Sequence, residues 1–239
     1  MNPNSTEARS LRAPKVVALI PAYNEAERIE ETVRATLSIP AVTSCIVIDD
    51  GSRDETAAIA ERAGAKVARL LGNAGKGGAL QFGAKRSEDA DYLLLLDGDL
   101  GDTAAQGAAL LEPVLAGAAD MTIATFPKPA GKAGFGFVKG MARKQIAAMG
   151  GGFLADAPLS GQRALTRECF DSTLPIGVGY GVEVTLTIRA LRAGFRLLEV
   201  PTTMSHAATG RNFAGFHHRG RQFVHVWLAL RKLRKETRR

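Results

Sequence analysis

The 239-residue chain lacks any apolar run of about 18 residues or more, the length that a membrane-spanning helix needs. Its first fifteen residues also lack the apolar segment of a secretory signal. Charged residues make up an ordinary 23%, which argues against a disordered chain. We therefore expect a cytoplasmic protein, soluble or held peripherally at the inner face of a membrane, with residues 1–14 as a disordered leader.

Cysteine is scarce, and internal repeats are absent. Cys45 and Cys169 lie far apart in the sequence and in apolar surroundings, and neither has a neighbour at the spacing of metal ligands. We expect both to be buried, reduced thiols without a functional role. A length of 239 residues suits one α/β domain with a single core.

Aromatic residues contribute only 6%, and no cluster of stacking side chains lies among the basic ones, so no nucleic-acid partner is expected. Acidic residues are nearly missing from the last 29 residues, where Glu236 stands alone. This basic end predicts an anionic neighbour. Its apolar residues predict a basic amphipathic C-terminal helix, which either lies on an anionic membrane surface or packs on its own domain or on a second subunit of a homodimer.

From Lys15 on, short apolar runs alternate with segments of helical period, the pattern of repeated β-α-β units. It predicts an α/β fold with a mostly parallel, Rossmann-like central sheet flanked by helices. A loop rich in Gly, Pro and Lys at residues 128–136 separates the halves 15–125 and 126–239. Strands are expected at 16–20, 45–48, 66–70, 92–96, 121–125, 161–165 and 196–200, and helices at 26–37, 54–63, 77–86, 104–116, 137–149, 181–193 and the C-terminus.

Polar residues follow three of these strands. The first strand runs into residues 21–25 (Pro-Ala-Tyr-Asn-Glu), the second into residues 49–52 (Asp-Asp-Gly-Ser), and the fourth into residues 97–99 (Asp-Gly-Asp). Each segment alone is also ordinary turn or capping chemistry. Ligands of parallel sheets bind beyond the carboxyl ends of the strands, so the shared position favours a binding site.

Asp97 and Asp99 are separated only by Gly98, so in an extended chain both carboxylates project to one side. Mg²⁺ and Mn²⁺ prefer oxygen ligands and are commonly shared between one or two carboxylates and substrate phosphates. The pair therefore predicts a metal site for a diphosphate.

Residues 73–78 (Asn-Ala-Gly-Lys-Gly-Gly) follow the third strand and open a helix, so their amides and Lys76 could face an anion. The segment lacks the Gly-Lys-Ser/Thr ending of a Walker loop. Nor does it follow the first strand, as the fingerprint of a dinucleotide site should. ATP-type P-loop binding and NAD binding are therefore disfavoured.

The order Pro-Ala-Tyr-Asn-Glu, Asp-Asp-Gly-Ser-x-Asp, Gly-Lys-Gly and Asp-Gly-Asp over residues 16–125 resembles glycosyltransferase family 2 and its relatives of GT-A fold. The resemblance implies a nucleotide-sugar pocket formed by these segments, with Asp99 as a catalytic residue. The nucleotide-sugar contacts implied in this way are Pro21, Ala22, Tyr23, Glu25, Asp50, Lys76, Asp97 and Gly98, and the implied metal ligands are Asp97 and Asp99.

Two segments of the second half, residues 158–161 (Pro-Leu-Ser-Gly) and 179–183 (Gly-Tyr-Gly-Val-Glu), are similar to segments of glucosyl-3-phosphoglycerate synthases and, more loosely, of polyprenyl-phosphate sugar synthases. The resemblance implies that Gly161 lies near the sugar, that Glu183 lies near the sugar or the acceptor hydroxyls, and that His206 is a third metal ligand. Arg211 belongs to a group of donors able to clamp a diphosphate. The chain departs from the synthases at Ser160 and Gln162, which leaves the acceptor open.

These features predict a metal-dependent hexosyltransferase with UDP-glucose as the expected donor, a GDP-sugar as the less favoured one, and a small phosphorylated or polyprenyl-phosphate acceptor. For a hydroxyl acceptor, Glu183 is the first candidate for the base and Asp156 the second, whereas a phosphate needs none. Stereochemistry stays open. Two alternatives are a catalytically silent nucleotide-sugar-binding protein and a sugar-phosphate nucleotidyltransferase, although the glycine- and arginine-rich signature of the latter is missing after the first strand.

Overall fold

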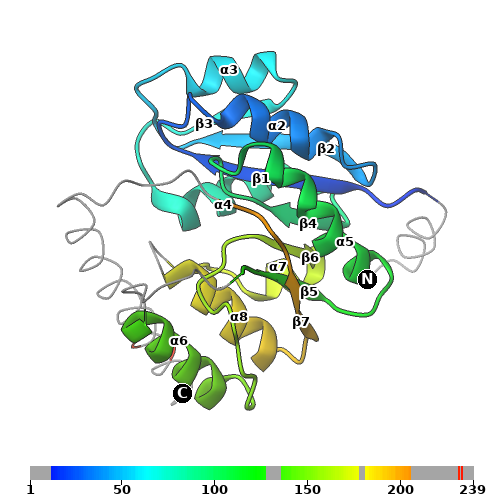
Figure 1. The fold of residues 1–239 in the computed structure, drawn as a ribbon, viewed down its shortest axis with the longest axis vertical. Coiled ribbons are helices and arrows are strands. Elements are labelled where there is room, and N and C mark those ends of the chain that lie inside the picture. Colours follow the sequence, from blue (N-terminus) through cyan, green and yellow to red (C-terminus); the bar gives the residue numbers. More distant parts are fainter. Residues whose placement is uncertain (1–11, 128–135, 178–180, 206–230, 232, 234–239) are drawn as a thin grey trace.

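The computed structural model describes residues 12–127, 136–177, 181–205, 231 and 233, and its centre is a seven-stranded sheet (Figure 1). The strand order is β3-β2-β1-β4-β6-β5-β7. Every neighbouring pair is parallel except those that β6 makes with β4 and β5. The prediction of a mostly parallel sheet is confirmed. The strands are β1 (Val16–Ala22), β2 (Val42–Asp49), β3 (Lys66–Arg69), β4 (Tyr92–Leu95), β5 (Met121–Thr125), β6 (Arg163–Thr166) and β7 (Leu197–Pro201).

Helices cover both faces of the sheet, which is why the central strands are apolar on both sides. In β1, Ala18 and Ile20 face one hydrophobic cluster and Val17 and Leu19 face another. The first face carries α2 (Ile29–Leu37), α3 (Thr56–Arg62), the 3₁₀ helix η1 (Gly101–Gln106) and α5 (Gly107–Leu115). The second carries α4 (Gly75–Lys85), α7 (Arg167–Ser172) and α8 (Val182–Arg192), with α6 (Gly136–Met149) packed against α8.

The expected elements are present with shifted ends. The helix expected at 104–116 begins instead as η1, because Gly101, at a φ of +56°, turns the chain soon after Asp99. Helix α7 is an addition that the sequence did not predict. Residues 1–11, the loop at 128–135 and the C-terminal helix expected beyond residue 205 lie outside the described residues.

Both cysteines are buried and unpaired, as expected, and burial raises the pKa of each thiol to about 12. In the described part of the chain, no helix combines the length and the apolar character that crossing a membrane requires.

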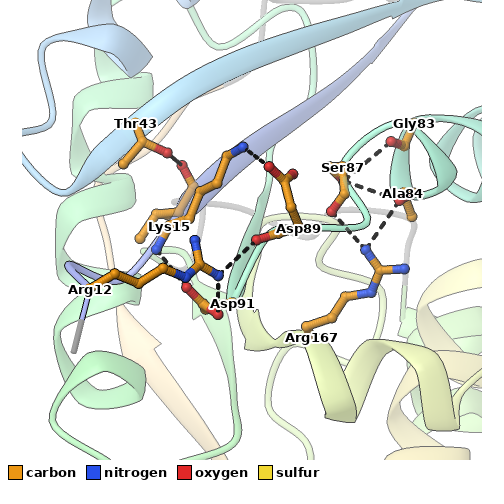
Figure 2. A network of polar contacts seen from close by, with 10 residues as sticks. Arg12, Lys15, Thr43, Gly83, Ala84, Ser87, Asp89, Asp91 and Arg167 are labelled. Atoms are coloured by element: carbon orange, nitrogen blue, oxygen red, sulfur yellow. Dashed lines mark hydrogen bonds and ion pairs between the residues drawn. The ribbon is translucent and has the colours of Figure 1, made fainter. Parts of the chain in front are cut away.

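A network of ion pairs closes the amino-terminal ends of β1 and β4 (Figure 2). The Asp91 carboxylate accepts from the backbone N–H of Lys15 at 2.8 Å and from the Arg12 guanidinium at 3.0 Å. Lys15 Nζ also pairs with the exposed carboxylate of Asp89, and this bond lowers the pKa of Asp89. Arg12, which lies within the predicted leader of residues 1–14, is therefore fastened to the folded domain.

Arg167 extends the network from the chain that follows β6 (Figure 2). Because β6 is antiparallel to β4, its end lies beside the start of β4. The Arg167 guanidinium donates to the carbonyls of Ala84 at 3.2 Å and Ser87 at 2.8 Å, both at the end of α4. At this edge of the sheet, acidic groups have basic partners and a helix end has a donor.

Candidate functional site

The opposite edge, at the carboxyl ends of β1 and β4, carries the predicted site. Gly98 lies directly against the residues that follow β1: a Cβ at Gly98 would come within 3.3 Å of the Glu25 side chain and 3.5 Å of the Pro21 carbonyl oxygen. The first contact is tighter than most Cβ contacts, and the second is an ordinary van der Waals contact. The structure therefore brings the Pro-Ala-Tyr-Asn-Glu and Asp-Gly-Asp segments together, as predicted.

The Asp-Gly-Asp turn is held from α2 by Thr32. The buried Thr32 hydroxyl lies 3.0 Å from the Gly98 carbonyl oxygen, to which it donates, and it accepts from the Gly101 N–H at 2.9 Å. The sequence did not point to this residue, because a threonine within a predicted helix belongs to none of the motifs at the strand ends. Thr32 fixes the loop that carries Asp97 and Asp99.

The first loop is fastened to the second. Asn24 adopts a left-handed φ of +58°, which asparagine tolerates better than most residues. Its N–H donates to the Ser52 hydroxyl at 2.9 Å, and its side-chain oxygen accepts from the Arg53 N–H at 2.8 Å. Since α2 begins only at Ile29, Asn24 does not cap it. The loop leaves Tyr23 42% exposed, so its ring is accessible to a planar ligand.

Asp50 is buried and organises the start of α4. Its two carboxylate oxygens accept from the N–H groups of Ala74 at 2.6 Å and Gly75 at 2.8 Å. These are two of the helix-start amides that the sequence suggested for a ligand anion. The anion that they contact in this structure is the carboxylate of Asp50. It fixes the start of α4 and thereby the position of Lys76.

Lys76 joins the two halves of the chain. Its ammonium lies 2.6 Å from an oxygen of Asp97, in the first half, and 3.1 Å from an oxygen of Glu183, in the second. Burial by itself would lower the pKa of Lys76, but the carboxylates of Asp97 and Glu183 outweigh burial and raise it. Lys76 therefore stays charged between Asp97 and Glu183, which belong to the two halves of the chain.

Gly161 and Gln162 complete that junction. A Cβ at Gly161 would lie 2.1 Å from Lys76 Nζ and 3.2 Å from both carboxylate oxygens of Asp97, so a side chain there would displace the ammonium. The Gln162 amide donates to the second oxygen of Asp97 at 2.6 Å. Sequence reasoning recorded Gln162 only as a departure from known synthases, whereas the structure makes it a direct partner of Asp97.

Negative charge is concentrated beside this junction. The pKa of Glu25 is raised from 4.5 to about 7, first by burial and then by the charges of Asp99 and Asp97. A carboxyl group is perturbed in this direction where acidic groups gather without enough positive charge. A divalent cation beside Asp97 and Asp99 would offset the charge that these two carboxylates bring to Glu25.

The donor set fits a hard cation that is shared with a ligand. In the described portion of the chain, no three His, Cys, Asp or Glu side chains are grouped as a complete metal centre. Mg²⁺ and Mn²⁺ do not need such a centre, because they retain waters and bind one or two carboxylates together with phosphate oxygens. Asp97 and Asp99 offer two such carboxylates, and the Gln162 amide donates to one oxygen of Asp97.

Other predicted residues are not brought together in this way. Asp156, the second candidate for a base, has a side chain that is 71% exposed and pairs with Arg143 of α6 at 3.4 Å. His206 and Arg211 lie outside the described residues. Glu183, the first candidate, is buried and faces Lys76.

Known proteins share both the sequence pattern and the fold. The sequence model of glycosyl transferase family 2 matches residues 17–154. The chain is 32% identical to the glycosyltransferase AglJ of Haloferax volcanii over 203 residues, which are 79% of this chain and 62% of AglJ. It is 28% identical to the undecaprenyl-phosphate mannosyltransferase of Micrococcus luteus, over 83% of this chain and 86% of that one.

Among solved structures, glucosyl-3-phosphoglycerate synthase of Mycobacterium tuberculosis, in complex with Mn²⁺, UDP-glucose and phosphoglyceric acid, superposes with a TM-score of 0.73. The identity is 25%, and the match covers 94% of this chain and 81% of the synthase. These similarities and the seven-stranded sheet confirm the predicted GT-A fold.

Proposed function

The chain belongs to glycosyl transferase family 2, and from that premise we propose that it uses Mg²⁺ or Mn²⁺ to transfer a hexose from a nucleoside-diphosphate sugar to an anionic acceptor. The observation that carries the proposal is the junction at Asp97. There a candidate metal ligand contacts Lys76 of the first half and Gln162 of the second, each at 2.6 Å.

In this proposal the nucleoside lies over residues 21–25, where Pro21, Ala22, Tyr23 and Glu25 line the pocket, with Asp50 at its base. The 42% exposure of Tyr23 supports a stacking contact with the base. UDP-glucose is the proposed donor because the similar synthase was crystallised with it. A GDP-sugar is the second candidate.

Asp97, Gly98 and Asp99 hold the diphosphate end. When bound, the cation neutralises charge that develops on the nucleoside diphosphate leaving group. Lys76 adds a second positive charge from the other side, and Gln162 keeps Asp97 in its orientation. The three groups thus act where charge appears during the transfer.

Gly161 and Glu183 form the acceptor side. The glycine at position 161 lets the backbone approach Lys76 Nζ and the Asp97 carboxylate closely, and the proposed place of the sugar is beside this contact. If the acceptor reacts through a hydroxyl, the Glu183 carboxylate can take its proton; a phosphate acceptor reacts as an anion without a base. The similarity to an undecaprenyl-phosphate mannosyltransferase supports a polyprenyl phosphate, and that to the synthase supports a small phosphorylated acid.

A donor-by-acceptor screen with product detection by mass spectrometry tests the proposal. Donors are UDP-glucose and GDP-mannose with Mn²⁺; acceptors are 3-phosphoglycerate and a short polyprenyl phosphate. We expect a hexosyl product with one pair, and none with EDTA. Nucleotide binding without transfer or donor hydrolysis would instead favour the silent binding protein, and formation of a nucleotide sugar from sugar phosphate would favour the nucleotidyltransferase.

A further inference from the structure

Arg163, at the start of β6, is the largest fully buried side chain in the described part of the protein. No ion pair joins it to a carboxylate of the described residues. Burial lowers the pKa of Arg163 to about 10, and the charge of Glu183 opposes that change. A buried guanidinium is expensive to desolvate, and an apolar residue would fill the same strand position without this cost. Its presence therefore calls for a role beyond packing.

The contacts of Arg163 lead to both parts of the acceptor side. Its Nε donates to the Ser160 carbonyl at 3.0 Å, next to Gly161. Its Nη2 donates to the Glu183 carbonyl at 3.1 Å. Its Nη1 donates at 3.0 Å to the Thr187 hydroxyl, which in turn donates to the same Glu183 carbonyl at 2.9 Å.

We infer that Arg163 is a positioning residue that fixes the first turn of α8 and the turn at Ser160 relative to one another, and so sets where Glu183 stands with respect to Lys76 and Asp97. The inference rests on the proposed function in one respect: it takes Glu183 to be a group that the transfer uses. Arg163 itself, with no exposed surface, does not reach a substrate.

The planar guanidinium suits this task because its donors point in fixed directions toward several acceptors at once. A lysine could keep the charge but would lose this geometry. The distance from the Glu183 carboxylate to Lys76 is 3.1 Å, so a small shift of α8 would break that contact. Misplacement by about 1 Å of a group near the reaction can lower the rate by about 100-fold.

Arg167, the first residue of α7 directly after β6, provides a matched control. It follows the other end of β6 and also donates to two backbone carbonyls, those of Ala84 and Ser87, but it does so at the edge remote from the site. Arg163→Lys and Arg167→Lys therefore make the same chemical change at the two ends of one strand.

The kinetic test compares turnover, donor KM and UDP affinity in the presence of Mn²⁺ for both variants, using the transfer reaction or donor hydrolysis. We expect Arg163→Lys to lower kcat about 10- to 100-fold while the Kd for UDP changes by less than about twofold. Arg167→Lys should leave kcat per folded molecule unchanged. In the Glu183→Gln background, Arg163→Lys should have little further effect on kcat.

Additive effects of Arg163→Lys and Glu183→Gln would overturn the inference, as would an equal loss of kcat in Arg167→Lys. So would a fall in UDP affinity as large as the fall in kcat, because that result indicates general damage. Thr187→Val, which removes one link of the contact at Glu183, gives a second variant should Arg163→Lys fail to fold; it should lower kcat in the same non-additive way.

A measurement without turnover separates this inference from the proposed function. Hydrogen exchange of the free protein should become faster in residues 183–187 of Arg163→Lys and stay unchanged in β1 and β4. If Arg163→Lys shows this local response but the wild-type protein neither binds nor cleaves any nucleotide sugar, the proposed function fails and the positioning contact stands. Unchanged exchange at residues 183–187 would overturn the positioning contact itself.

Discussion

Acidic side chains have different surroundings, and pKa values shifted in opposite directions, at the two ends of β1 and β4. At the amino-terminal ends, Asp89 and Asp91 have Arg12 and Lys15 as partners, and the pKa of Asp89 is lowered (Figure 2). At the carboxyl-terminal ends, burial and the neighbouring charges of Asp99 and Asp97 raise the pKa of Glu25 to about 7. One edge satisfies its charges internally and contributes to stability. The other raises the pKa of a carboxyl group that lies beside the proposed metal ligands, a perturbation that is typical of functional sites.

The largest effect that distinguishes the two edges should come from Asp99→Ala. If Asp99 holds the cation against the diphosphate, we expect transfer and donor hydrolysis to fall by at least about 10³-fold, since such a metal contributes several kcal/mol to transition-state stabilisation. Steady-state rates measure this, and the midpoint of thermal unfolding without ligand should stay close to wild type. Activity within tenfold of wild type would remove Asp99 from the proposed site.

Asp91→Ala should lower stability and leave activity unchanged, the converse of Asp99→Ala. It leaves the partly buried Lys15 N–H and the exposed Arg12 guanidinium without their carboxylate partner, so the loss should be about 1 kcal/mol, the lower end of the cost of an unsatisfied donor. Urea unfolding should show that loss in free energy of unfolding, while kcat per folded molecule is unchanged. A loss of activity without a loss of stability would mean that the two edges do not divide their roles in this way.

A smaller effect concerns Glu25 and pH. Because the pKa of Glu25 is higher in the folded than in the unfolded state, the folded state binds more protons between pH 4.5 and 7, and stability falls as pH rises through that window. Glu25→Gln removes this group, so its stability should fall less than that of wild type between pH 5 and 8. Urea unfolding at several pH values gives the comparison, and identical slopes for both proteins would contradict it.

The smallest effect is expected for Asp89→Asn. The lowered pKa of Asp89 gives the opposite sign: its contribution is present above the unfolded pKa of 3.8 and is lost as pH falls through the folded value. The variant should therefore be slightly less stable than wild type near neutral pH and equal to it in acid, and the fully exposed ion pair limits the size of the difference. Unfolding curves at neutral and acidic pH measure this difference in stability between the variant and wild type. A difference that grows as the pH falls would contradict the predicted contribution of Asp89.

The sequence was most informative where a pattern is local. Apolar runs marked the seven strands, and the polar residues at their ends identified Pro21 to Glu25 and Asp97 to Asp99 as neighbours, because parallel strands align their carboxyl ends. The shift from predicted helix 104–116 to η1 and α5 depended on the backbone of Gly101, which the apolar pattern does not record. Similarly, nothing in the sequence near residue 12 indicated that Arg12 would reach Asp91.

Local sequence patterns could not predict the contacts between the two halves of the chain, residues 15–125 and 126–239. Gln162 lies beside Asp97 because β6 runs antiparallel beside β4, an arrangement that the alternation of strands and helices did not predict. Glu183 is brought to Lys76 from α8, far along the sequence. Thr32 and Arg163 act through backbone atoms, so their residue types alone did not point to the site. A charged residue inside an apolar strand was the one available signal for Arg163.

The central claim is that Asp97 and Asp99 join a cation to a nucleoside diphosphate, and calorimetric titration with UDP tests it most directly. The Kd is measured for wild type and for Asp99→Asn, each with Mn²⁺ and with EDTA. We predict binding by wild type that weakens by at least about tenfold, equivalent to 1.4 kcal/mol, when the cation is removed. For Asp99→Asn we predict weak binding that Mn²⁺ does not improve. Equal affinity in all four titrations would contradict the account.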